Sequence, residues 1–283
     1  MPPPTTQNEI ELFKAVLIGS VYDESSWHLV ENEPSDSSRR WHVRLKHAAL
    51  VRLASLVGRT SMSLVRRVPY ASKRRNTGND WPMFGYSMVG RERLDNLQFC
   101  VETVLNEAVP GDFIETGVWR GGACMLVKRM LQVHQVTERK VWLADSFCGM
   151  PIPTDERDGP DLSEVGILAV TADQVRRNFE RFNLLDNNVR FLEGWFADTL
   201  PNAPVNQIAV LRLDGDHYHS TMDALIHLYH RVSPHGFVIV DDYGSWESCR
   251  RAVHDFFEKD HEIPKFEKID DTGVFWRKTA TGG

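Results

Sequence analysis

The sequence predicts an α/β fold, in which a mostly parallel sheet of seven strands carries helices on both faces. Beyond residue 80, short apolar runs alternate with segments of helical periodicity, the pattern of consecutive βαβ units. The chain ends in two short runs around a turn, which predicts a C-terminal hairpin. With 283 residues, 42% of them hydrophobic, the chain can form one large domain, or one domain plus an extension.

The predicted elements follow one another in a regular order. Each strand is an apolar run that ends at glycine or at an acid, and each helix shows apolar residues three and four positions apart. The strands are expected at 112–118, 140–147, 188–196, 208–216 and 236–243, the helices at 123–134, 171–184, 220–232 and 245–260, and the hairpin at 266–278.

Residues 1–79 are predicted to form a helical, basic extension, either a lid or an oligomerisation segment, ahead of a main domain at 80–283. Residues 39–75 carry eleven Lys and Arg and no acid, which leaves 22 basic against 39 acidic residues elsewhere. Apolar residues at 45, 48, 49, 53, 56 and 57 indicate an amphipathic helix. It can pack on its own acidic domain or on a second subunit, or contact an anionic membrane surface. Nucleic acid is disfavoured, because no recognised binding motif accompanies the charge.

Cysteine usage and the N-terminus favour a cytoplasmic protein. The four cysteines are isolated, without a CxxC pair, as expected for reduced thiols. The first residues lack the basic start and apolar middle of a secretory signal. No apolar run approaches the roughly 18 residues of a membrane span.

The turn after the first predicted strand favours S-adenosylmethionine over a dinucleotide. Its glycines follow the pattern G-x-x-x-G-G, and Glu115 lies two residues before Gly117. The dinucleotide fingerprint requires G-x-G-x-x-G, and Glu115 would repel a pyrophosphate, whereas it would not repel an ammonium and a sulfonium. Asp145, at the end of the second strand, is placed to accept hydrogen bonds from ribose hydroxyls.

Four acids end the fourth and fifth predicted strands: Asp214, Asp216, Asp241 and Asp242. Because carboxyl ends of parallel strands meet at one edge of a sheet, these acids should lie together. Clustered carboxylates repel one another, and a cation relieves that repulsion. Oxygen ligands favour a hard ion such as Mg²⁺ or Mn²⁺. The neighbouring His217 and His219 leave a mixed His/Asp site for Mn²⁺ or Fe²⁺ open.

Five motifs resemble the macrocin O-methyltransferase family: DFIETGVWRGG, ADSFCGMP, LEGWFADTLP, LRLDGDHYHSTMDAL and VDDY. The resemblance runs from about residue 80 to residue 277 and implies a Rossmann-like class I methyltransferase fold. It also implies an enzyme that uses S-adenosylmethionine and a divalent metal to methylate sugar hydroxyls, often on antibiotics, and it points to a homo-oligomer. Alternatives are a metal-dependent O-methyltransferase of a catechol or phenol, and a non-catalytic binding protein of this fold.

The resemblance also assigns site residues. It makes Asp214, Asp241 and Asp242 the metal ligands and Asp216 the general base. The family pattern after DGD is Leu-Tyr-Glu, whereas this chain has His217-Tyr218-His219, so His219 is an alternative base. Met88 and Tyr218 are expected on the acceptor side. The expected cofactor contacts are Glu115, Gly117, Trp119, Gly121, Asp145, Ser146, Phe147, Gly194, Trp195 and Phe196.

Overall fold

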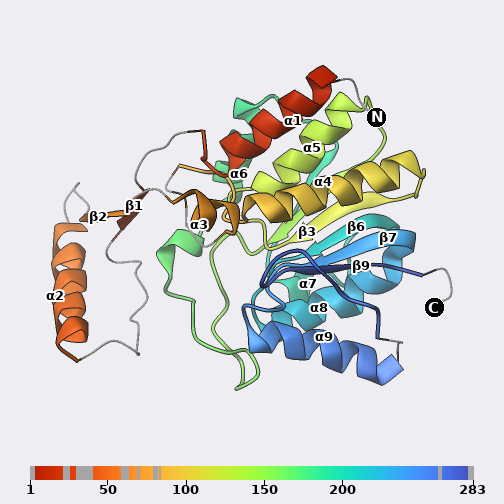
Figure 1. Ribbon diagram of the computed structural model, residues 1–283. Helices are drawn as coiled ribbons and strands as arrows, with labels where there is room; N and C mark the ends of the chain where they lie inside the picture. Colours follow the sequence, from red (N-terminus) through yellow and green to blue (C-terminus); the bar gives the residue numbers. More distant parts are fainter. Residues whose placement is uncertain are drawn as a thin grey trace.

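The computed structural model describes residues 4–21, 26–29, 41–58, 64–68, 71–78, 82, 84–260 and 263–279. A sheet lies between two layers of helices, with α1, α4, α5 and α6 on one face and α7, α8 and α9 on the other (Figure 1). The prediction of an α/β fold with helices on both faces is confirmed.

The described residues form a sheet of seven strands in the order β5-β4-β3-β6-β7-β9-β8. Strands β3 to β7 run parallel, and β9 joins β7 in antiparallel register, which gives the predicted C-terminal hairpin. The strands are β3 (Asp112–Thr116), β4 (Val141–Asp145), β5 (Val189–Glu193), β6 (Ile208–Leu213), β7 (Val232–Val240), β8 (Glu267–Lys268) and β9 (Val274–Arg277).

Helices connect and cover the strands. Strands β3, β4 and β5 follow one another outward on one side of the sheet, and β6 and β7 do so on the other side. The strand order therefore reverses between β3 and β6. Ligands bind at such a reversal, outside the carboxyl ends of the strands. The helices are α1 (Pro4–Leu17), α2 (Trp41–Gly58), α3 (Ser72–Asn76), α4 (Arg91–Asn106), α5 (Gly122–Val133), α6 (Ala172–Arg181), α7 (Phe196–Thr199), α8 (Tyr218–Leu228) and α9 (Glu247–Asp260).

Side chains alternate between the two faces of the sheet along each strand, and the core is therefore divided into two hydrophobic clusters. Phe113 packs under α4 and α5, whereas Ile114 faces the layer of α8 and α9, as successive side chains of a strand point to opposite faces. Burial of these apolar side chains is the main stabilising contribution, about 25 cal/mol per Å².

The N-terminal residues 4–21 are part of the main core. Ile10, Phe13, Leu17 and Ile18 are buried in the cluster of α4 and α5. Helix α2 and the two-stranded ribbon of β1 (Ser26–Leu29) and β2 (Val65–Val68) lie at the left of Figure 1, apart from the sheet. The division into 1–79 and 80–283 stays a prediction, and its boundary falls outside the described residues.

Several element boundaries differ from the sequence prediction, and the contacts explain two of them. The strand expected to reach residue 196 ends at Glu193, because Gly194 has φ +139° and the Trp195 carbonyl already accepts from the first turn of α7. The helix expected from residue 220 begins at Tyr218. The cause is Asp158, whose carboxylate accepts from the backbone nitrogen of His219 at 2.9 Å and so satisfies a free N–H of the first turn.

Candidate active site

The turn after β3 requires glycine at its first position. Gly117 has φ +87°, and a Cβ there would lie 1.7 Å from the carbonyl oxygen of Asp214. The ends of β3 and β6 therefore approach each other more closely than any side chain allows. Trp119 and Gly121, both expected at the cofactor, follow in this turn, and Gly121 precedes the first residue of α5.

Asp145 ends β4 and holds that turn. Its Oδ2 accepts from the backbone nitrogens of Val118 at 2.6 Å and Trp119 at 3.3 Å, and its Oδ1 accepts from that of Phe147 at 2.7 Å. Burial raises the pKa of Asp145, while these hydrogen bonds oppose the rise. Ser146 donates to the carbonyl of Gly149 at 2.7 Å. The ribose contact expected of Asp145 stays a prediction, and the structure adds a role in shaping the turn.

The other expected cofactor residues lie near the same edge of the sheet. The backbone nitrogen of Gly194 donates to the carbonyl of Asp145 at 2.9 Å, which places the end of β5 beside the end of β4. Trp195 is 40% exposed, so its ring is open to a ligand. The Phe196 ring lies beside Gly215, where a Cβ would be 3.3 Å from it. Direct cofactor contacts of these residues stay predictions.

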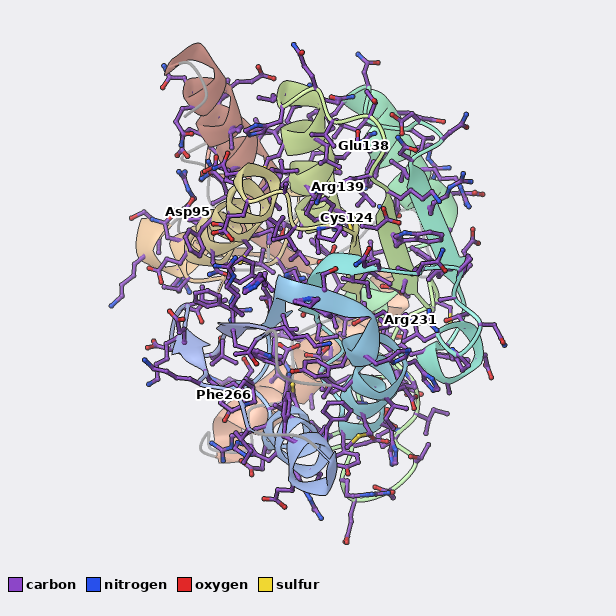
Figure 2. All side chains as sticks on the ribbon, turned by 90° about the vertical axis from the view of Figure 1, so that its right-hand side faces the viewer. Asp95, Cys124, Glu138, Arg139, Arg231 and Phe266 are labelled. Atoms are coloured by element: carbon purple, nitrogen blue, oxygen red, sulfur yellow. The ribbon has the colours of Figure 1, made fainter. Side chains whose placement is uncertain are left out.

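Glu115 lies beneath the turn rather than on its surface. It lies on the same face of β3 as Phe113, toward α5, where its Oε2 accepts from the Cys124 thiol at 2.9 Å. Figure 2 labels Cys124. Its Oε1 accepts from Arg212, the neighbouring residue in register on β6. Burial raises the pKa of Glu115 to about 7, although Arg212 opposes the rise. Both oxygens are thus engaged inside the protein, so Glu115 supports the turn, and a direct contact with the cofactor stays a prediction.

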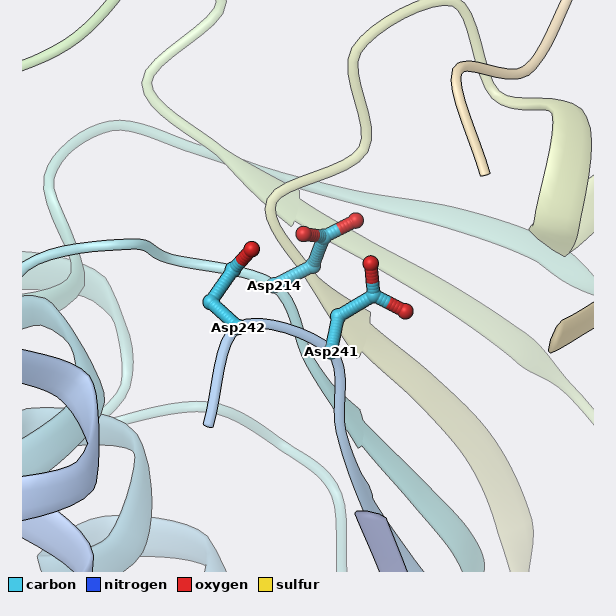
Figure 3. Close-up of side chains that lie close together, drawn as sticks. All are labelled: Asp214, Asp241 and Asp242. Carbon is cyan, nitrogen blue, oxygen red and sulfur yellow. The ribbon is translucent and has the colours of Figure 1, made fainter. Parts of the chain in front are cut away.

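Asp214, Asp241 and Asp242 come together at the carboxyl ends of β6 and β7. One ligand oxygen from each lies within 4.8 Å of the others, and the three carboxylates converge in Figure 3. Burial raises the pKa of Asp242 well above its ordinary value, and Asp216, Asp214 and Asp241 add to the rise. The cluster of described residues contains only carboxylate oxygens, the ligands that suit Mg²⁺ or Mn²⁺. The donor set therefore fits a divalent cation.

Two arginines, which sequence reasoning missed, hold Asp241 from both sides. Arg212 donates to its Oδ1 at 2.5 Å, and Arg93 of α4 donates to its Oδ2. Arg212 also donates to Oδ2 of Asp214 at 2.8 Å. Burial lowers the pKa of Arg212, but the surrounding carboxylates raise it well above its ordinary value. A charged residue inside the apolar run of β6 was the signal that could have revealed Arg212.

Asp216 lies two residues beyond Asp214 and is half-buried. Burial raises its pKa to about 7, and the charge of Asp214 adds to the rise, whereas a hydrogen bond from Trp246 opposes it. This is the pKa range suited to a general base near neutral pH. The structure therefore gives Asp216 the environment expected of a base, although that role stays a prediction.

The side chain of His219, the alternative base, contacts a loop residue, Asp155. Its Nε2 lies 3.0 Å from Oδ2 of Asp155, and its side chain is 37% exposed. Of the two residues expected on the acceptor side, Tyr218 is buried and donates to Asp255 at 2.9 Å, while Met88 is half-buried before α4. The Tyr218 hydroxyl is thus engaged with α9 and not directed at the carboxylate cluster.

Comparison with known proteins settles the family. A family model described as Macrocin-O-methyltransferase (TylF) matches residues 6–278. The chain belongs to the macrocin O-methyltransferase family. The match begins well before residue 80 and spans the segment with eleven basic residues, beyond the range that the five motifs indicated.

Relatives within this family are O-methyltransferases. One, from Streptomyces olivaceus, is named 8-demethyl-8-(2,3-dimethoxy-alpha-L-rhamnosyl)-tetracenomycin-C 4'-O-methyltransferase; it is 54% identical over 211 residues, which cover 73% of this chain and 80% of the relative. Another, the mycinamicin III 3''-O-methyltransferase of Micromonospora griseorubida, is 45% identical over 77% of this chain and 88% of its own length. The solved structure of the O-methyltransferase NovP superposes with a TM-score of 0.78 at 39% identity, covering 97% of this chain and 99% of NovP. This chain is accordingly an O-methyltransferase of that family.

Proposed function

We propose that the protein transfers a methyl group from S-adenosylmethionine to a hydroxyl of a sugar moiety, on a glycosylated natural product or a glycan, with Mg²⁺ or Mn²⁺ bound. The observation that carries the proposal is the cluster of Asp214, Asp241 and Asp242 beside Asp216, at the sheet edge that also carries the glycine turn. The name of the Streptomyces olivaceus relative places that protein's methylation on a rhamnosyl-bearing compound. That name supports a sugar acceptor for this chain.

The cofactor is proposed to lie across the ends of β3, β4 and β5. Asp145 would accept hydrogen bonds from its ribose, and the exposed Trp195 would cover its adenine. The turn at Gly117 and Gly121 admits the cofactor close to the backbone. Bound there, S-adenosylmethionine supplies an already activated methyl group, so the chain's task is to align the acceptor oxygen with it.

Asp214, Asp241 and Asp242 are the proposed ligands of the cation. A divalent ion bound there would neutralise the carboxylates and polarise the acceptor hydroxyl. Asp242 is the most available of the three, because its carboxylate accepts only a long hydrogen bond, 3.4 Å from the backbone nitrogen of Asp216, from the described residues. Arg93 and Arg212 fix the plane of the Asp241 carboxylate.

Asp216 is the proposed general base. A sugar hydroxyl has a pKa far above neutral, and its proton must leave as the oxygen attacks the methyl group. Asp216 takes that proton on a carboxylate oxygen. Positioned bases typically contribute about 10²- to 10⁴-fold to the rate.

Methyl transfer from labelled S-adenosylmethionine to a panel of acceptors tests the proposal. The panel contains free sugars, sugar nucleotides, glycolipids, glycosylated aglycones and, as the competing class, catechols. The proposal predicts transfer to sugar-bearing compounds that stops with chelator and returns with Mg²⁺. Transfer to catechols alone would contradict it.

We further propose that the protein is a cytoplasmic homo-oligomer with α2 at a subunit interface. Leu45, Leu53 and Leu56 of α2 are 61%, 52% and 68% exposed, an apolar face that a second copy would cover. The positive charges of the basic segment 39–75 would attract the acidic remainder of a neighbouring chain. The competing possibility is that they attract anionic lipid. Among the described residues, no helix is long and apolar enough to cross a membrane.

A further inference from the structure

Asp216 has a backbone conformation that its surroundings must hold. Its φ is +56°, in the left-handed region that residues other than glycine adopt infrequently. The residue sits in the short connection between β6 and α8, so no strand or helix fixes it. Contacts from other elements therefore decide where its carboxylate points.

Three contacts hold Asp216, and two of them come from the start of α9. Trp246 Nε1 donates to Oδ1 of Asp216 at 2.8 Å, and Ser248 Oγ donates to its backbone carbonyl at 3.2 Å. The third joins the backbone nitrogen of Asp216 to Oδ2 of Asp242. Asp216 is thus held at its nitrogen, its carbonyl and one carboxylate oxygen.

The same turn links these contacts to the carboxylate cluster. The backbone nitrogen of Trp246 donates to the carbonyl of Asp242 at 3.0 Å. The indole ring packs against the hydrophobic cluster of α8 and α9, which gives its N–H a fixed direction. Oδ2 of Asp216 accepts no hydrogen bond from the described residues, so one oxygen is held and the other is left for a ligand.

We propose that Trp246 and Ser248 are positioning residues for the base, which direct Oδ2 of Asp216 at the acceptor hydroxyl. This inference rests on the proposed function, because it takes Asp216 as the proton acceptor. Trp246 binds Oδ1 and sets the rotation of the carboxylate, and Ser248 holds the strained backbone beneath it. Neither side chain takes the proton or contacts the methyl group.

Trp246→Phe tests the inference, because phenylalanine keeps an aromatic ring in the cluster and removes only the donor. Trp276→Phe is the matched control: Trp276 packs in the same cluster, against Tyr229, Phe257 and Phe266. The assay uses the full chain, Mg²⁺ and the panel glycoside with the highest turnover. For Trp246→Phe we expect kcat to fall about 10- to 100-fold, with unchanged acceptor KM and cofactor affinity and a larger solvent deuterium isotope effect. Trp276→Phe should leave kcat and the isotope effect unchanged.

The indole resonance gives a readout that needs no acceptor. Trp246→Phe identifies the Trp246 indole N–H signal in a ¹⁵N-labelled sample. Asp216→Ala should shift that signal upfield, since its hydrogen-bond acceptor is lost. A signal that does not move would overturn the inference, because the hydrogen bond on which it rests would be absent in solution.

Ser248→Ala keeps the inference falsifiable if Trp246→Phe does not fold, and it should lower kcat in the same way by a smaller factor. Wild-type kcat in the folded Trp246→Phe and Ser248→Ala variants, with Asp216→Ala inactive, would overturn the positioning role and leave the base intact. Wild-type turnover in Asp216→Ala would overturn the base assignment of the proposed function, and this inference with it.

Discussion

Arg93 of α4 is hydrogen-bonded to Asp241 at the end of β7, across a sequence separation of 148 residues. The same guanidinium donates through Nε to Asp270 at 2.8 Å and through Nη2 to Thr272, in the turn of the C-terminal hairpin. One side chain thus joins a helix, a candidate metal ligand and the hairpin. Lysine could not reproduce this, because the arrangement uses the planar fork of the guanidinium.

Arg93→Met should therefore destabilise the metal-free protein by about 3–5 kcal/mol, the scale for removing one partner from a buried ion pair, because Asp241 would keep only Arg212. Urea unfolding in chelator measures the loss. Arg91→Met is the control on the same helix. Arg91 is 28% exposed and pairs with Glu11 and Asp95, so we expect a loss of about 0–1 kcal/mol. Saturating Mg²⁺ should recover part of the Arg93→Met loss, since the cation supplies positive charge at Asp241. Equal losses in the two variants would refute the buried role of Arg93.

Asp145→Ala should weaken S-adenosylmethionine binding by about 1.5–3 kcal/mol, the scale of hydrogen bonds to a charged group. The variant loses the ribose contact and also the support of the turn at Val118 and Trp119. Asp112→Ala is the control, because Asp112 is at the opposite end of β3 and binds Trp142 Nε1. Calorimetry that finds the same cofactor affinity in Asp145→Ala and wild type would remove Asp145 from the site.

Asp216→Asn should change how stability depends on pH in the metal-free protein. Burial raises the pKa of Asp216 to about 7, whereas an unfolded aspartate has a pKa of about 3.9. Between these values the folded state keeps a proton that the unfolded state has lost, so wild-type stability falls as the pH rises through this window. Asparagine has no such proton. The stability of the variant relative to wild type should therefore increase from about pH 4 to about pH 7 and stay constant at higher pH.

Urea unfolding across this window, in chelator, measures the difference between the two proteins. A difference that stays constant with pH would show that the pKa of Asp216 is not raised. Glu115 has a similarly raised pKa, but it is present in both proteins, so its contribution cancels in the comparison.

Replacing Leu45, Leu53 and Leu56 together by glutamine should reduce the oligomeric state, because the change removes the exposed apolar face of α2. Leu12→Gln on α1 is the control, since Leu12 is also 61% exposed. Substituting these residues is preferable to deleting the N-terminal segment, because the deletion would also remove α1, which is part of the main core. Sedimentation velocity gives the result. Unchanged assembly together with lost binding to anionic liposomes would favour the membrane-surface interpretation.

The sequence predicted the features that depend on local pattern. Alternating apolar runs predicted the parallel strands, and the acids that end two of them predicted the cluster at Asp214, Asp241 and Asp242. The turn at Gly117 could be located because glycine is favoured where the backbone of a turn has a positive φ. These features depend on residues near one another in the chain, or on the general rule that parallel strands end at one edge.

The supporting contacts could not be predicted in the same way. Arg93, Arg212 and Trp246 act on partners brought near by the fold. Of the three, only Arg212, a charge inside the apolar run of β6, carries a sign of this in the sequence. The hydrogen bond from the Cys124 thiol to Glu115 likewise depends on the fold, while the cofactor contact expected of Glu115 stays a prediction. The end of β5 was misplaced because Trp195 and Phe196 extend an apolar run, although Gly194 breaks the strand.

Methyl transfer by Asp242→Ala, with chelator and then with added Mg²⁺, tests the central claim most directly. Asp242 belongs to the carboxylate cluster, and Asp145 holds the proposed cofactor site separately. The account predicts that wild type loses activity in chelator and regains it with Mg²⁺, while Asp242→Ala stays inactive in both and still binds S-adenosylmethionine. Near-wild-type turnover of Asp242→Ala in chelator would contradict the metal-dependent mechanism.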